Sequence, residues 1–142
     1  MEVSQVRKQL KTAIDAARER AQQHRQRSTE AERAFATFLQ DVATPVARQV
    51  VIALKAEGYG FTVATPGGGL RLAAERGRDD FIDIALDTSG PRPQVVGRIS
   101  YSRGSRTLDE ERPLKPAASP DSVTEQDVLD FLLGALEPWL ER

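Results

Sequence analysis

The chain has 142 residues and a formal net charge of −1, with 39% hydrophobic and 29% charged residues, a composition typical of one folded domain with or without an appendage. It contains no cysteine, which excludes disulfides, thiolate metal sites and a thiol nucleophile, and no apolar run approaches the roughly 18 residues that cross a bilayer. The opening residues lack the apolar stretch of a secretory signal, so we expect a cytoplasmic protein, and its net charge favours no particular class of partner.

The segment from residue 4 to residue 43 contains neither glycine nor proline and is rich in Ala, Gln, Glu and Arg, which favour helix. A set of its positions alternates in steps of four and three, as the a and d positions of a heptad repeat do. These seam positions are Leu10, Ile14, Ala17, Ala21, His24, Ser28, Ala31, Phe35, Phe38 and Val42. Forty helical residues would extend about 60 Å, and no other segment predicts a helix of that length. We therefore predict that residues 1–43 form a coiled coil that makes the chain a homodimer.

Two other interpretations of this helix remain open. The middle of the seam holds small residues that bury little apolar surface, so the helix could instead fold its Phe35 and Phe38 end onto its own globular domain. A break at residues 28–32 is the second alternative, because the sequence Ser-Thr-Glu-Ala-Glu there has the pattern of an internal capping box. His24, the only histidine, falls at a d position, where we expect it to set the register rather than to sense pH.

Residues 44–142 are predicted to form the globular domain. Thr44 suits the N-cap of a second helix and Pro45 suits its first position, where a missing N–H costs nothing. Gly58 supplies the left-handed residue that commonly ends a helix.

Five alternating segments then predict strands, separated by turn residues. They span residues 61–65, 70–74, 81–87, 94–102 and a short stretch around Leu108. Gly104-Ser105 matches a two-residue hairpin loop, and the connections throughout are short, which favours an antiparallel meander. We interpret Pro66-Gly67-Gly68-Gly69 as a plain hairpin loop, because the lysine of a phosphate-binding loop is missing.

The last helix begins after Thr124, with Asp127 at the third helical position and a hydrophobic staple between Val123 and Val128. Apolar residues surround most of its circumference, which predicts burial on more than one side. We expect the sheet to cover one of these sides and the second helix or another subunit to cover the other. Pro138 ends or kinks this helix.

The only carboxylate cluster in the folded part consists of Asp79, Asp80, Asp83 and Asp87. Asp83 and Asp87 would lie about 13–14 Å apart along one strand face, which is too far for both to hold one ion. Cross-strand ion pairs with Arg71 and Arg98 on the surface of the sheet explain the same aspartates without a functional site. The sequence therefore predicts no catalytic residue, no metal and no cofactor, and we expect that the protein is not an enzyme.

The fourth and fifth strands form a mildly basic hairpin, and the last 27 residues carry six acidic side chains against one basic one. The candidate partner-binding residues of this hairpin are Arg98, Tyr101, Arg103 and Arg106. Basic side chains next to an aromatic ring suit an acidic protein or the phosphates and bases of a nucleic acid. Nearby Asp109, Glu110 and Glu111 weaken the nucleic-acid interpretation.

The sequence thus predicts an α+β fold: a long N-terminal coiled-coil helix, a second helix, an antiparallel β-meander of about five strands, and a C-terminal helix packed on the sheet. The predicted function is that of a non-catalytic dimerising adaptor, scaffold or regulatory subunit that binds another protein. A nucleic-acid-binding accessory protein that uses the Arg98–Arg112 hairpin is one alternative, and a small secretion-type chaperone is another. The preference for Arg over Lys indicates a GC-rich bacterial genome.

Overall fold

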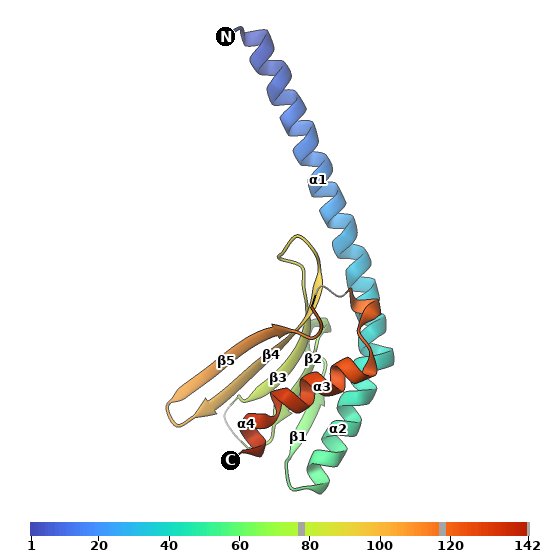
Figure 1. Ribbon diagram of the computed structural model, residues 1–142, viewed down its shortest axis with the longest axis vertical. Helices are drawn as coiled ribbons and strands as arrows, with labels where there is room; N and C mark the ends of the chain where they lie inside the picture. The colour runs from blue at the N-terminus through green and yellow to red at the C-terminus, as the bar shows by residue number, and fades with distance from the viewer. Residues whose placement is uncertain (77–78, 117–118, 142) are drawn as a thin grey trace.

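The computed structural model describes residues 1–76, 79–116 and 119–141, and it confirms the predicted α+β fold (Figure 1). The helical elements are α1 (Val3–Phe38), the π-helical segment η1 (Leu39–Ala43), α2 (Thr44–Ala56), the 3-10 turns η2 (Pro66–Gly68) and η3 (Pro120–Ser122), α3 (Glu125–Ala135) and α4 (Glu137–Leu140). The strands are β1 (Phe61–Ala64), β2 (Leu70–Ala74), β3 (Phe81–Asp87), β4 (Gln94–Arg103) and β5 (Arg106–Pro113).

The first three helical elements form one helical path that changes direction at η1 (Figure 1). The second helix is confirmed, but its predicted N-cap is wrong: Thr44 has helical backbone angles, and its N–H donates to the carbonyl of Leu39, five residues back. Pro45 explains this wider turn, because a proline in an α-helix lacks the N–H and clashes with the carbonyl four residues earlier. The π-helical segment accommodates that ring without ending the helix.

Two further predictions about this helical path can be compared with the structure. The alternative of a break at residues 28–32 is wrong, since α1 runs through them without interruption. The predicted glycine end of α2 is confirmed, with Gly58 at a φ of 91°. The N–H of Tyr59 donates to the carbonyl of Leu54 at 2.8 Å and that of Gly58 to Lys55 at 3.1 Å, which is the Schellman arrangement.

The sheet is an antiparallel meander in the order β1-β2-β3-β4-β5, as predicted. Its register places Leu72 opposite Ile82 and Ile82 opposite Ile99, so three buried aliphatic side chains form a row across one face. Because side chains alternate along a strand, this face, which we call the inner face, is the one that buries the core.

The inner face is covered by α3 and α4, with α2 packed beside α3 (Figure 1). The capping box of α3 is confirmed: Thr124 Oγ1 accepts from the N–H of Asp127 at 3.2 Å, and the Asp127 carboxylate accepts from the N–H of Thr124 at 2.9 Å. At the C-terminal end, the Trp139 ring lies edge-on to Phe61 at 5.6 Å and to Tyr101 at 5.0 Å between ring centroids. These aromatic contacts join the first and fourth strands through α4.

The end of α1 belongs to the same core, since Phe35, Phe38 and Leu39 are buried with the sheet and α3 residues. The domain boundary predicted between residues 43 and 44 therefore has core side chains on both of its sides. The N-terminal part of α1 projects away from the head, which is the compact body formed by the sheet and the remaining helices (Figure 1). One half of the long helix is thus fixed to the head, and the other half has no packing partner among the described residues.

Candidate interaction surfaces

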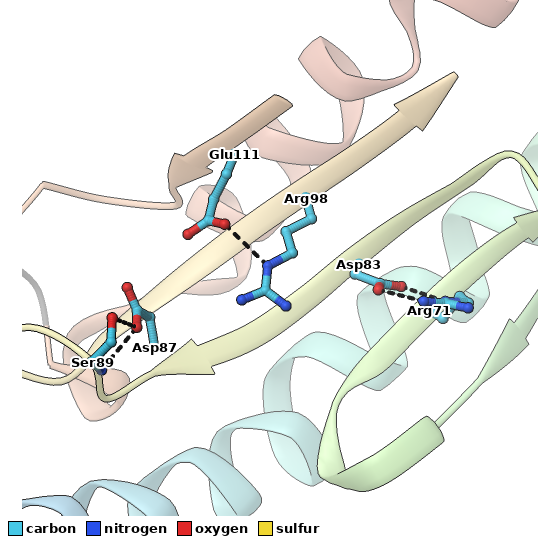
Figure 2. Close-up of polar contacts among 6 residues, drawn as sticks. All are labelled: Arg71, Asp83, Asp87, Ser89, Arg98 and Glu111. Carbon is cyan, nitrogen blue, oxygen red and sulfur yellow. Dashed lines mark hydrogen bonds and ion pairs between the residues drawn. The ribbon is translucent and has the colours of Figure 1, made fainter. Parts of the chain in front are cut away.

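The face of the sheet opposite the core, which we call the outer face, carries a row of alternating charges across four strands (Figure 2). Arg71 of β2 makes two hydrogen bonds to Asp83 of β3, from Nε to Oδ1 at 2.7 Å and from Nη2 to Oδ2 at 2.8 Å. Its guanidinium also lies 3.9 Å from the centroid of the Phe81 ring. The hydrogen bonds to Asp83 raise the pKa of Arg71 above its usual value. Arg71 is therefore held in place by its own sheet.

The row continues to the edge of the sheet. Asp83 is the register partner of Arg98, and Arg98 in turn is the partner of Glu111. Arg98 Nε lies 3.2 Å from Glu111 Oε2, in a pair that is about half exposed. The predicted cross-strand pairing of Asp83 with Arg71 is confirmed, and Arg98 is placed opposite Asp83 as expected. An exposed pair of this kind contributes at most about 1 kcal/mol, so Arg98 can exchange Glu111 for another anion at low cost.

The four aspartates do not converge on one point. Asp80 is buried and accepts a hydrogen bond from the N–H of Ser102 at 2.8 Å, whereas Asp79 is exposed. Asp87, at the end of β3, accepts from the Ser89 hydroxyl at 2.6 Å and from the Ser89 N–H at 2.9 Å, and these bonds lower the pKa of its carboxyl. Within the described part of the chain, no group of three or more His, Asp or Glu side chains is arranged to hold a metal ion.

The four predicted partner-binding residues do not form one surface. Tyr101 is 6% exposed and packs on Trp139 in the core, so it faces away from Arg98. Arg103 and Arg106 are exposed register partners across the Gly104-Ser105 turn, at the far tip of the hairpin. Five residues of extended strand separate Arg98 from Arg103, about 16 Å. Among the four residues, only Arg103 and Arg106 are adjacent to each other. On the outer face, the negative charges of Asp109 and Glu111 offset the positive charge of Arg98.

The ten predicted seam residues divide between two environments. Phe35 and Phe38 are buried against the head, and Ser28, Ala31 and Val42 are partly buried. The remaining five lie on the projecting half of α1 and are exposed: Leu10, Ile14, Ala17, Ala21 and His24. Leu10 is 58% exposed and Ile14 is 40% exposed. The alternative in which the Phe35 end of the helix folds onto its own domain is therefore what the structure shows for that end.

The projecting half of α1 carries a feature that the heptad positions alone do not reveal. Five of the six e and g positions between Leu10 and Ser28 are basic, and all five side chains are exposed. They are Lys11, Arg18, Arg20, Arg25 and Arg27. The acidic residues of the same stretch, Asp15 and Glu19, lie at positions b and f, away from the seam. Reading the flanks as well as the seam would have found this basic border from the sequence.

A second exposed stripe lies on α3 and α4. Residues 119–141 carry six acidic side chains and no basic one. Leu133 is 51% exposed and Leu140 is 41% exposed, and the exposed carboxylates of Asp130 and Glu137 alternate with them at steps of three and four. The predicted interruption near Pro138 is present: α3 ends at Ala135, and the short helix α4 begins at Glu137 with Pro138 in its first turn. Asp130 and Leu133 therefore belong to α3, and Glu137 and Leu140 belong to α4.

Two open clefts flank α1 where it meets the head. One, of about 780 Å³, lies between Arg27 and Glu30 of α1 and the segments that contain Arg92 and Asp121. The other, of about 360 Å³, lies between α1 and the Gly67–Gly69 loop, which forms the predicted β1–β2 hairpin connection. Two positive and two negative side chains line the larger cleft, so its lining favours no ligand of one charge.

None of the described helices is both long and apolar enough to cross a membrane. Three exposed surfaces of the described residues carry side chains suited to binding: the projecting half of α1, the acidic stripe of α3 and α4, and the tip of the β4–β5 hairpin. Comparison of the chain with protein-family models, with curated proteins and with solved structures gives no match.

Proposed function

We propose that the protein is a non-catalytic adaptor of the cytoplasm that self-associates through the projecting half of α1 and binds another protein through its head. The observation that carries this proposal is the exposed half of the seam, Leu10 to His24, which we call the exposed half-seam. Residues 3–27 form about 37 Å of helix, at 1.5 Å per residue, and they display Val3, Val6, Leu10 and Ile14 to solvent. Each such side chain gains about 1.5–3 kcal/mol when it is fully buried.

The contrast within one helix supports an intermolecular use of this seam. Phe35 and Phe38 continue the same a and d pattern and are buried against the head. The pattern is the same before and after residue 28, but only the second part meets a partner within its own chain. A helix that carries an apolar face is stabilised chiefly by packing that face, so the first part, with Leu10 and Ile14 exposed, is suited to a partner supplied by another molecule.

The disposition of the carboxylates favours binding over catalysis. Asp83 is bound by Arg71, Asp87 by Ser89 and Asp127 by Thr124. Catalytic acids and bases are usually found together in a concave pocket, whereas these three groups stabilise a strand pair, a turn and a helix end.

A nucleic-acid-binding role for the β4–β5 hairpin draws support from Arg103 and Arg106 alone. Both are exposed at the tip of the hairpin, where two adjacent cations could contact phosphates. The outer face of the sheet carries two arginines, Arg71 and Arg98, and a larger number of carboxylates, which weakens its attraction for a polyanion. These carboxylates are Asp83, Asp87, Asp109 and Glu111. We therefore place this role second.

The experiment that tests the proposed function removes the exposed half-seam. Leu10→Ser together with Ile14→Ser should weaken self-association of the full-length chain about tenfold or more, because the two largest apolar side chains among the exposed seam residues are lost. Analytical ultracentrifugation over a range of concentrations measures the change. The matched control is Gln9→Ser with Gln23→Ser, at exposed c positions of the same helix, which should associate as the wild-type chain does. Equal association of both variants would overturn the proposal.

A further inference from the structure

The proposed self-association leaves open what the projecting half of α1 contacts. We infer that it docks on the acidic stripe of α3 and α4 of a second copy of the chain, rather than on a second α1. This inference rests on the proposed function and names the surface that receives the helix. The contact would join two different surfaces, α1 of one copy and the α3–α4 stripe of the other.

The basic border of the seam argues against pairing α1 with itself. In a parallel coiled coil, a g residue faces the e residue five positions later in the partner helix, which places Arg20 of one copy against Arg25 of the other. In an antiparallel pair, e positions face e positions and g positions face g positions, so Arg18 and Arg25 or Arg20 and Arg27 meet. Like charges brought together at an interface are unfavourable by up to several kcal/mol. The flanks of this helix therefore suit a partner with acidic side chains.

The α3–α4 stripe has the complementary charge and the same spacing. Its carboxylates at Asp130 and Glu137 are exposed, and no lysine or arginine occurs between residues 119 and 141. Leu133 and Leu140 are seven residues apart, which is the separation of Leu10 and Ala17 along the d positions of α1. Apolar side chains of similar spacing can pack along a facing helix, so Leu133 of α3 and Leu140 of α4 would meet the half-seam while the carboxylates meet its basic border.

The two surfaces cannot meet within one chain. The projecting half of α1 leads away from the head, whereas α3 and α4 lie on the sheet (Figure 1). The ion pairs among the described residues involve no basic side chain of α1. A second copy is the occupant that supplies an acidic, leucine-bearing helix of the right spacing. Reciprocal docking of two copies would close a dimer, and one-way docking would build a longer assembly.

Charge exchange on the full-length chain tests this docking. The first variant, Arg18→Glu with Arg25→Glu, reverses the charge of two of the five basic side chains that border the seam of α1. The second variant, Asp130→Lys with Glu137→Lys, makes the α3–α4 stripe basic. All four side chains are exposed, and circular dichroism checks that both variants are folded. Each variant alone should self-associate about tenfold more weakly than wild type, because two attractive charge contacts of the docked surfaces would become repulsive. An equimolar mixture of the two should associate again, and so should one chain that carries all four substitutions.

The control is Asp15→Lys with Glu19→Lys, which changes the net charge as the second variant does but acts at the b and f positions of α1. It should associate as the wild-type chain does. If the Asp130→Lys and Glu137→Lys variant also associates like wild type, or if the mixture of the two exchanged variants stays monomeric, the inferred docking is wrong while self-association through α1 stands. If the wild-type chain itself is monomeric, the proposed function fails and the docking fails with it.

Discussion

Gly97 of β4 leaves space for Phe131 of α3 against the sheet. A Cβ placed on Gly97 would lie 2.0 Å from Cζ of Phe131, far inside van der Waals contact, and Phe131 is buried. Gly97→Ala should therefore lower the free energy of unfolding by about 1–3 kcal/mol, the usual range for overpacking a core, as measured by urea denaturation. Phe131→Leu in the same chain should restore part of the loss.

The control for that substitution is Gly90→Ala, because a Cβ on Gly90 meets no atom nearer than 4.0 Å. Such a surface change should stay within about 0.5 kcal/mol of wild type. Equal effects at the two glycines would contradict the packing of α3 on β4.

Single residues also show where sequence reasoning succeeds and where it stops. The pairing of Asp83 with Arg71 was predictable, because alternation fixes the face of each strand residue and short connections fix which strands are neighbours. Tyr101 was predictable as an inward-facing residue from the same alternation, although an aromatic residue close to Arg98 in sequence also suggests a shared binding surface. The two residues are an odd number of positions apart and so lie on opposite faces.

At the scale of the element, the cap of α3 gives a prediction about pH. The hydrogen bonds from the backbone N–H of Thr124, together with its side chain, hold the pKa of Asp127 below its usual value. A carboxyl whose folded pKa is depressed stabilises the fold above the unfolded pKa of about 3.9, and this contribution is lost as the pH falls through the folded value. The stability difference between wild type and Asp127→Asn should therefore shrink as the pH is lowered through that window.

Thermal unfolding followed by circular dichroism between pH 5 and pH 2 measures that difference. Glu125→Gln removes a charge from the same helical turn but leaves the Thr124 hydrogen bonds in place, so it should show a smaller dependence on pH. A wild-type and Asp127→Asn difference that is constant across this range would contradict the cap.

The same scale explains why the start of α2 was not predicted correctly. Thr44-Pro45 has the local pattern of a helix start, but Ala43 and Ala47, on either side, are both fully buried. Packing on both sides of the proline favours a continuous helix, and η1 provides the extra turn width. Tertiary burial outweighed a local capping preference, and a single sequence does not report which of the two prevails.

For the whole molecule, the heptad pattern identified which face of the long helix is apolar but not what covers it. Periodicity is the same whether the partner is the chain's own head, as for Phe35 and Phe38, or another copy, as we propose for Leu10 and Ile14. The five-stranded order was predictable because every connection is short. The division of the seam at residue 28 was not, because it depends on the position of the folded head.

Sedimentation equilibrium of the unmodified chain tests the central claim most directly. One chain has a mass of 15.6 kDa. If the exposed half-seam mediates self-association, the weight-average mass should rise above that value with increasing protein concentration in the micromolar range, and it should fall again as salt is added, because charges contribute to the contact. A mass that stays at 15.6 kDa across the whole range of concentration and salt would contradict the account.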